Sequence, residues 1–167
     1  MNGSFNFFLH LIAFGLVAGA LIPSFILDRK LRAEQDWGRK LYIGSIMRTL
    51  GAAAPYNIAL LIITGVGNMY NRTFGFSYPW YEEQWLVIKL SCFLVLAINA
   101  LFVVPKIGKQ RSMIIKSFVD KSASIDSEEM YKNLNKKISL LFLVQTTLLL
   151  AILFLSAFGS GKHYGEF

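Results

Sequence analysis

Apolar residues dominate four long stretches of this chain, and polar or charged residues gather between them. The apolar stretches cover residues 5–27, 49–69, 85–104 and 138–158. Each has about 20 residues, enough for an α-helix to cross the roughly 30 Å hydrocarbon core of a bilayer. The pattern predicts an all-α protein, a four-transmembrane-helix bundle that forms a single integral membrane domain over residues 1–167.

The composition agrees with a membrane protein. Hydrophobic residues make up 54% of the chain and charged residues only 16%, and the mean hydropathy is +0.48. A soluble domain of this size carries more charge. The first apolar stretch has no basic segment before it and ends near Pro23 and Asp28 without a small-residue cleavage site. We therefore expect a membrane helix there and not a signal peptide.

Basic residues are distributed unevenly between the apolar stretches. They are frequent in residues 28–48 and 105–137, whereas residues 70–84 contain Arg72 beside Glu82 and Glu83. Because cytoplasmic loops are enriched in Lys and Arg, the pattern predicts a cytoplasmic loop over 105–137 and both termini on the outer, periplasmic side. The predicted location is the inner (cytoplasmic) membrane of a bacterium, with N-out/C-out topology.

The net charge of +7 is explained by this topology and by attraction to anionic lipid headgroups. Nucleic-acid binding is not expected, because no recognition motif and no basic stretch interleaved with exposed aromatic residues occurs. Within the basic segment, residues 112–119 are predicted to form a short amphipathic helix, and Ser127 with two glutamates behind it is predicted to begin a helix. The segment between the second and third stretches is predicted to form an aromatic belt at headgroup level. Its aromatic residues are Phe74, Phe76, Tyr78, Trp80, Tyr81 and Trp85.

His10 lies within the first apolar stretch. At 1.5 Å per residue, His10 and Lys89 both lie roughly 6 Å inside the predicted outer surface. On the second stretch, Asn57, Thr64 and Asn68 fall close to one line on the helix surface. His10, Lys89 and Asn68 are therefore predicted to form a polar, cofactor-sized pocket near that surface.

Each of these residues has alternative roles. The alternative role of Lys89 is to extend its side chain to the outer headgroups. The alternative role of Asn57, Thr64 and Asn68 is to form hydrogen bonds between helices. An intramembrane histidine is hydrogen-bonded across helices, bound to iron or haem, or used in proton transfer. The sequence leaves these alternatives open.

Two other features concern helix packing. Gly15 and Gly19 form a small-xxx-small face that points away from His10 on the helical wheel, and it is predicted to contact either another membrane subunit or a second copy of the chain. Pro55 removes the backbone donor that would bond to the Gly51 carbonyl, so it is predicted to bend the second helix.

Several short motifs resemble the CopD-like and HemJ-like four-helix membrane proteins over about the first 105 residues. The motifs are FFLHLIAFGLVAGALIPSFIL, RKLYIGSIMRTLGAAAP with the later TGVGNMY, and WLVIKL. HemJ-like proteins are haem b-binding protoporphyrinogen oxidases, and other relatives handle copper. The resemblance implies His10 as the axial ligand of haem b, with Lys89 and Arg48 as charged partners. The chain departs from the HemJ-like pattern in two places, where it has Asn99 and the run NLNKKIS.

The first functional hypothesis is a haem b-binding membrane protein for electron transfer or porphyrin oxidation, with His10 Nε2 on the iron and Lys89 beside a propionate. His163 and Met69 are candidates for the sixth iron position. The alternative is a non-catalytic subunit of a larger respiratory, photosynthetic or transport complex. A proton-coupled transporter needs a membrane carboxylate, and we expect every Asp and Glu to lie outside the spans. Copper handling is disfavoured because the methionines are scattered. Whether the protein is an enzyme stays open.

Overall fold

The computed structural model describes residues 3–72, 77 and 79–158, and this part of the chain is helical without strands. Two long rods come from α1 and α6, and the other two are composite. The elements are α1 (Gly3–Ala33), α2 (Trp37–Ala52), α3 (Ala54–Arg72), the 3₁₀ turn η1 (Trp80–Glu82), α4 (Gln84–Ile98), the π-helical segment η2 (Asn99–Val103), α5 (Val104–Val119) and α6 (Ser127–Phe158).

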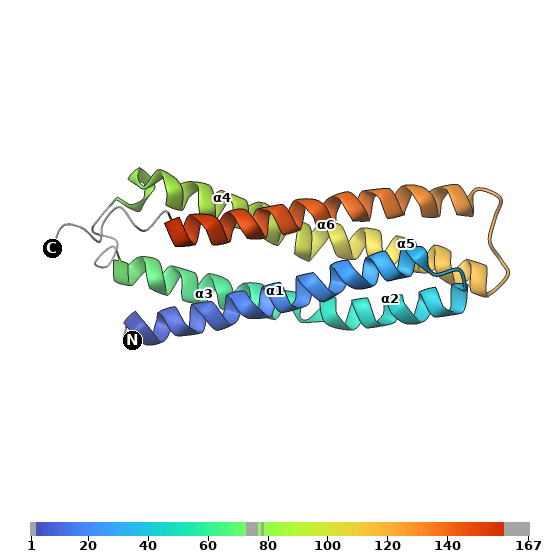
Figure 1. Cartoon of the computed structure of the whole chain (residues 1–167), viewed down its shortest axis with the longest axis horizontal. Helices are drawn as coiled ribbons and strands as arrows, with labels where there is room; N and C mark the ends of the chain where they lie inside the picture. The colour runs from blue at the N-terminus through green and yellow to red at the C-terminus, as the bar shows by residue number, and fades with distance from the viewer. Residues whose placement is uncertain (1–2, 73–76, 78, 159–167) are drawn as a thin grey trace.

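The helices build four antiparallel rods that run side by side (Figure 1). The second rod is α2 followed by α3, and the third is α4, η2 and α5. Four helices in the described part are long and apolar enough to cross a membrane: Ser4–Ala33, Trp37–Asn71, Gln84–Val119 and Ser127–Phe158. The predicted four-helix membrane bundle is confirmed at this level.

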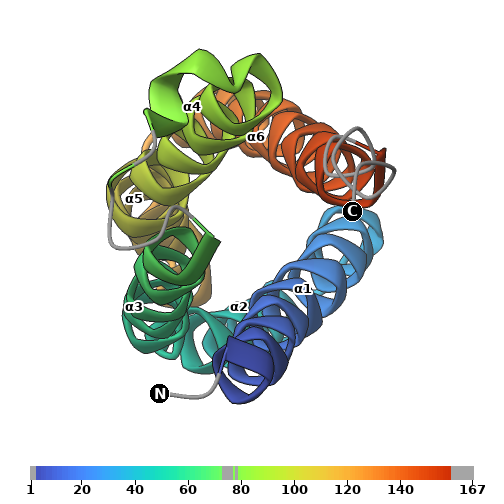
Figure 2. The same ribbon diagram turned by 90° about the vertical axis from the view of Figure 1, so that its left-hand side faces the viewer.

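The rods form a ring when viewed along the bundle (Figure 2). Helix α1 contacts α2 and α3 on one side and α6 on the other, and α6 contacts α4 and α5. Helix α2 closes the ring by packing against α5. Such a ring leaves its middle to be filled by side chains or by a ligand.

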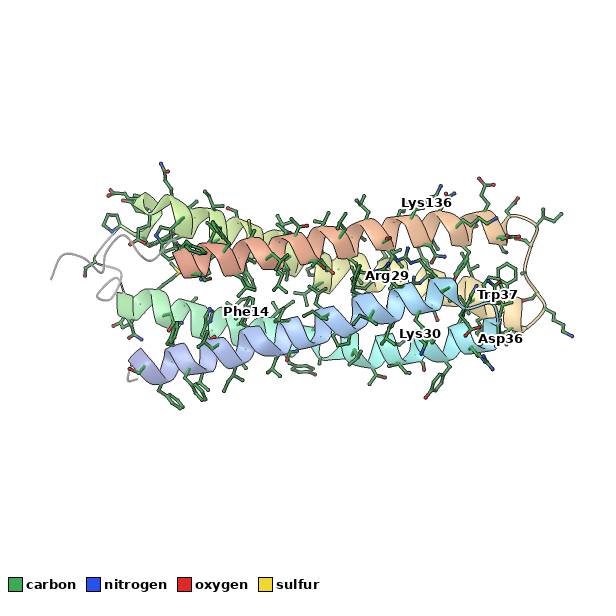
Figure 3. All side chains as sticks on the ribbon, in the orientation of Figure 1. Phe14, Arg29, Lys30, Asp36, Trp37 and Lys136 are labelled. Carbon is green, nitrogen blue, oxygen red and sulfur yellow. The ribbon has the colours of Figure 1, made fainter. Side chains whose placement is uncertain are left out.

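The two ends of the bundle differ in composition. Helix α1 begins and α6 ends at the same end, which we name the terminal end. Residues 34–36 and 120–126 make the connections at the opposite end, which we name the basic end. Figure 3 shows Arg29, Lys30 and Lys136 in the half nearer the basic end and Phe14 in the terminal half.

The helices at the basic end are longer than the apolar pattern predicts. Helix α1 continues through residues 28–33, and α2 starts at Trp37, so the first connection shrinks to residues 34–36. The loop predicted over 105–137 is confined to residues 120–126, because α5 runs to Val119 and α6 begins at Ser127. The predicted helix over 112–119 is part of α5, and the predicted helix start at Ser127 is confirmed.

Local hydrogen bonds and an apolar cluster explain these extensions. Asp36 caps α2 by accepting a hydrogen bond from the Arg39 amide at 2.7 Å. Glu34 accepts hydrogen bonds from the amides of Asp36 and Gln35, and these bonds lower the pKa of the Glu34 carboxyl. The charged helix ends also pack on one another through a buried cluster, so they remain helical beyond the apolar stretches. Its members are Leu31, Ile43, Ile115 and Tyr131.

Two composite rods are interrupted near the middle of the bundle. Helices α2 and α3 meet at Ala53, two residues before Pro55, so the second rod is interrupted next to the proline that was predicted to bend it. The third rod widens into the π-helical segment η2, which ends at Val103, two residues before Pro105. Proline lacks a backbone donor, and π-helical turns often accompany functional sites.

Candidate functional site

A polar layer joins α1 to α3 in the terminal half of the bundle, and we define it as Asn6, His10, Thr64 and Asn68. His10 Nδ1 lies 2.9 Å from Thr64 Oγ1. Asn6 Nδ2 donates to the Thr64 carbonyl oxygen at 2.9 Å and to Asn68 Oδ1 at 2.6 Å. Asn6 and Thr64 are buried at 4% and 3% exposure. The layer therefore holds two membrane helices together by hydrogen bonds between side chains.

The hydrogen bonds of Thr64 favour one tautomer of His10. Thr64 Oγ1 donates its only proton to the Leu60 carbonyl at 2.8 Å, so it accepts from the Nδ1–H of His10. In the neutral ring, Nε2 then carries the lone pair. Histidines that bind metals are commonly oriented by such a bond at the other ring nitrogen.

Two glycines of α3 let α1 come close at this layer. A Cβ added to Gly65 would lie 3.4 Å from His10 Cε1, and one added to Gly67 would lie 2.9 Å from both Nδ2 and Oδ1 of Asn6. The Asn6 amide cannot move away without giving up its two hydrogen bonds. The TGVG motif is thus explained by close helix packing.

The structure brings three of the four predicted site residues into one region. His10 and Asn68 belong to the polar layer, and the charge of Lys89 on α4 acts on His10. Arg48 is far from them, because the 16 residues between Arg48 and Thr64 correspond to about 24 Å along the second rod. Arg48 Nη2 instead donates to Ser112 Oγ on α5 at 2.9 Å.

Several other predicted features have a clear position. Asn57 donates to the Leu16 carbonyl at 3.4 Å, so the predicted line of Asn57, Thr64 and Asn68 faces α1. Gly15 and Gly19 are exposed on the outside of the bundle, with no neighbouring atom within 4 Å of an added Cβ. Phe74, Phe76, Tyr78 and His163 lie outside the described residues.

A central cavity of about 790 Å³ lies inside the ring, between the polar layer and the basic end. Its volume is within the range of about 300–1,000 Å³ that is typical of small-molecule sites. All four rods contribute to its walls, and on α1 the lining runs from Val17 to Leu31, about 21 Å at 1.5 Å per residue. His10 is not part of the lining, so the polar layer and the central cavity are separate sites.

The cavity lies between two packed apolar clusters. On the terminal side is a cluster of Ala13, Val17, Leu61, Leu96, Leu149 and Ile152. On the other side is the cluster of Leu31, Ile43, Ile115 and Tyr131. Val17 and Leu96 of the first cluster and Leu31 and Ile115 of the second also line the cavity, so each cluster packs against one of its ends.

The side of the cavity opens between the interrupted rods. Exposed lining residues from the second rod are Arg48, Gly51, Ala52 and Pro55, and those from the third rod are Pro105, Lys109, Met113 and Lys116. Exposed residues next to both proline-associated interruptions are therefore part of the lining.

Gln145 is a polar side chain buried in the wall of this cavity. It is 3% exposed and lies on α6, in the middle of an otherwise apolar stretch. Its amide therefore offers a hydrogen-bond donor and an acceptor in an otherwise apolar part of the wall.

A buried ion pair closes the cavity at the basic end. Asp28 on α1 is fully buried and pairs with Arg111 on α5, which is 5% exposed, and with Arg32 Nε at 3.0 Å. Arg111 also donates to Asn135 Oδ1 at 3.3 Å. Asp28 follows the first apolar stretch in the sequence but lies in the same continuous helix, because α1 extends to Ala33.

Haem iron and metal ions are held by ligand atoms of protein side chains. The described residues contain no group of three or more His, Cys, Asp or Glu side chains that could hold a metal ion. His10 offers one nitrogen for iron, but the cavity large enough for a macrocycle begins about 10 Å further along α1. His10 Nε2 thus offers one axial position for iron, in a part of the bundle that is separate from the central cavity.

Comparisons of the chain with protein-family models, curated proteins and solved structures found no match. The resemblance to CopD-like and HemJ-like proteins therefore stays a prediction. Function is therefore inferred from the cavity and the polar layer.

Proposed function

We propose that this chain is a multi-pass membrane protein that binds an elongated apolar molecule in its central cavity. The observation that carries the proposal is a cavity of about 790 Å³ with apolar walls toward the terminal end and one buried amide, Gln145, in its wall. An apolar pocket with a few placed polar groups is the usual form of a small-molecule site.

The route of access follows from the position of the opening. It lies where the apolar parts of the second and third rods give way to basic residues, which corresponds to the headgroup level of a bilayer. A molecule dissolved in the membrane enters there without crossing water. The proposed location is a bacterial inner membrane, with the basic end in the cytoplasm and both termini outside.

Native mass spectrometry of the full, delipidated chain tests the proposal with monooleoylglycerol, a neutral probe. We expect one bound probe molecule per chain. Gly108 lines the cavity and has no atom within 4 Å of an added Cβ, so Gly108→Phe fills the cavity and abolishes binding. Gly15→Phe is the matched control, because Gly15 faces outward with equal space. Equal binding by the two variants would refute the proposal.

A second candidate function, haem b binding for electron transfer or porphyrin oxidation, is favoured by one observation. The Thr64 hydroxyl orients His10 so that Nε2 presents its lone pair, as in histidines that hold a metal. Lys89 supplies positive charge beside the ring. A reduced-minus-oxidised absorption spectrum of the purified protein tests this candidate. It predicts a Soret band that is lost in His10→Ala, and a colourless protein after haem is supplied argues against it.

The exposed Gly15 and Gly19 face supports a further proposal, contact with a second copy of the chain or another membrane subunit. This proposal corresponds to a structural role in a larger complex. This proposal predicts that the chain associates with a second copy or another subunit in the membrane. Gly15→Phe is expected to abolish this association, and Gly108→Phe is expected to leave it unchanged.

A further inference from the structure

The lining of the central cavity is strongly asymmetric in charge. Among the described residues that line it, five are basic and none is acidic. The basic ones are Lys40, Arg48, Lys109, Arg111 and Lys116. All five lie toward the basic end, whereas the other walls are apolar apart from Ser24, Asn57 and Gln145.

Two of these five cations already have partners. Arg111 is neutralised by the buried carboxylate of Asp28. Lys40 lies over the ring of Trp37 at 4.0 Å and over that of Tyr131 at 4.9 Å. Neither is required to bind anything else.

The remaining three form a group at the opening. Lys109, Ser112 and Lys116 follow one another at spacings of three and four residues on α5, so they share one face of the helix. Arg48 of α2 reaches this face through its hydrogen bond to Ser112. No ion pair joins Arg48, Lys109 or Lys116 to a carboxylate in the part of the chain that the structure describes.

This group lies at the level where an amphiphile keeps its head. The exposed residues beside it, Gly51, Pro55 and Pro105, mark the lateral opening, and the apolar walls continue from there toward the terminal end. A molecule with its apolar body in the cavity would present its head to the three cations. Guanidinium and ammonium groups recognise carboxylate and phosphate oxygens.

We infer that the central cavity takes an anionic amphiphile from the surrounding bilayer, with its carboxylate or phosphate head bound by Arg48, Lys109 and Lys116 and its apolar body directed toward Gln145. The inference rests on the proposed function and adds the chemical class of the ligand. The opening between Pro55 and Pro105 is the route by which the apolar body enters.

The test compares oleate with its neutral methyl ester by native mass spectrometry of the full chain in a neutral detergent. We expect oleate to bind about tenfold more tightly than methyl oleate, the factor that corresponds to about one charge-assisted hydrogen bond. In the double variant Arg48→Gln, Lys109→Gln this preference disappears, while methyl oleate binds as before. Dodecyl phosphate in place of oleate distinguishes a phosphate head from a carboxylate head.

The matched control is Lys136→Gln, Lys137→Gln. It removes the same charge from the basic end, at two exposed residues of α6 that do not line the cavity. It is expected to keep the full preference for oleate. If it loses the preference as the first double variant does, the effect is one of overall charge and the inference is overturned.

The other outcomes separate the inference from the proposed function. Equal binding of oleate and methyl oleate by the parent chain overturns the anionic ligand and leaves an apolar ligand in place. Binding of neither probe overturns both proposals. Competition by millimolar inorganic phosphate or butyrate against oleate shows a site for soluble anions, and this result also overturns the inference.

Discussion

Asp28 is the buried charge that joins the helices of the basic end. Its carboxylate is fully buried and contacts Arg111 from α5 and Arg32 from its own helix. Arg111 in turn reaches Asn135 on α6, so one carboxylate organises three rods. A buried charge without its partner is far more costly than an intact pair or no pair.

Substitution Asp28→Asn is therefore expected to destabilise the protein strongly. It leaves the buried Arg111 without a counter-charge, which costs about 3–5 kcal/mol. Thermal unfolding in detergent micelles measures the loss. The double variant Asp28→Leu, Arg111→Met removes both charges and is expected to recover most of the stability. An Asp28→Asn protein as stable as the parent would contradict the importance of the pair.

Gly67 is predicted to tolerate no side chain. A Cβ there would contact the Asn6 amide at 2.9 Å, and that amide is held by hydrogen bonds to Thr64 and Asn68. Gly67→Ala is expected to cost about 1–3 kcal/mol of stability, because it strains the packing or breaks these bonds. Gly15→Ala, at an open position, is the control, and equal unfolding temperatures for the two variants would contradict the close approach of α1 and α3.

The sequence predicts part of this residue-level arrangement. His10, Thr64 and Asn68 stand out as polar residues in apolar stretches. Asn6 was not identified, although its spacing of four residues from His10 places it on the same face of the helix. Asp28, Arg111 and Gln145 were not identified as site residues. Their roles depend on which helix faces meet, and one sequence does not contain that information.

At the scale of elements, the interruption between α2 and α3 is what opens the cavity. The Ala53 amide donates to the Leu50 carbonyl at 3.4 Å, longer than a usual backbone hydrogen bond of about 2.9–3.0 Å. Pro55 supplies no donor to the preceding turn. The second rod is therefore weakest where it lines the opening.

Pro55→Ala is expected to restore a continuous helix through Ala53. The new amide at position 55 can bond to the Gly51 carbonyl, so backbone amides near Ala53 should exchange with solvent more slowly. Hydrogen–deuterium exchange measured by mass spectrometry in lipid nanodiscs checks this. The same exchange rate in parent and variant would show that Pro55 does not cause the interruption.

The positions of the four helices were predicted correctly, whereas their lengths at the basic end were predicted too short. Runs of about 20 apolar residues located all four rods, because the bilayer sets their length. The extensions at the basic end contain many charges, and apart from the helices predicted over 112–119 and from Ser127 they were assigned to the segments between the spans. They are helical because Leu31, Ile43, Ile115 and Tyr131 bury one another, which is a tertiary effect.

At the scale of the whole molecule, the distribution of basic residues predicts the orientation in the membrane. A protein with Cys92→Ala and a new cysteine at exposed Ser122, in the connection at the basic end, should react with a membrane-impermeant maleimide only after cells are opened. A cysteine at exposed Gln84, at the terminal end, should react in intact cells. The reverse labelling pattern would contradict the proposed topology.

The whole bundle is a ring of four rods around a cavity that has a packed cluster at each end and is open at one side. Its apolar walls and the cations Arg48, Lys109 and Lys116 support the proposed amphiphilic ligand, and both interrupted rods contribute exposed residues to its lining. The polar layer between α1 and α3 holds the terminal half together and is independent of that cavity.

The most direct test is a crystal structure of the full chain grown in a lipidic mesophase with 9,10-dibromostearate. Anomalous scattering locates the bromine atoms without reference to any assumed ligand position. The account predicts a bromine signal inside the ring, among Leu21, Leu101 and Gln145, with the carboxylate beside Arg48. Bromine signal found only on the lipid-facing outside of the helices would contradict it.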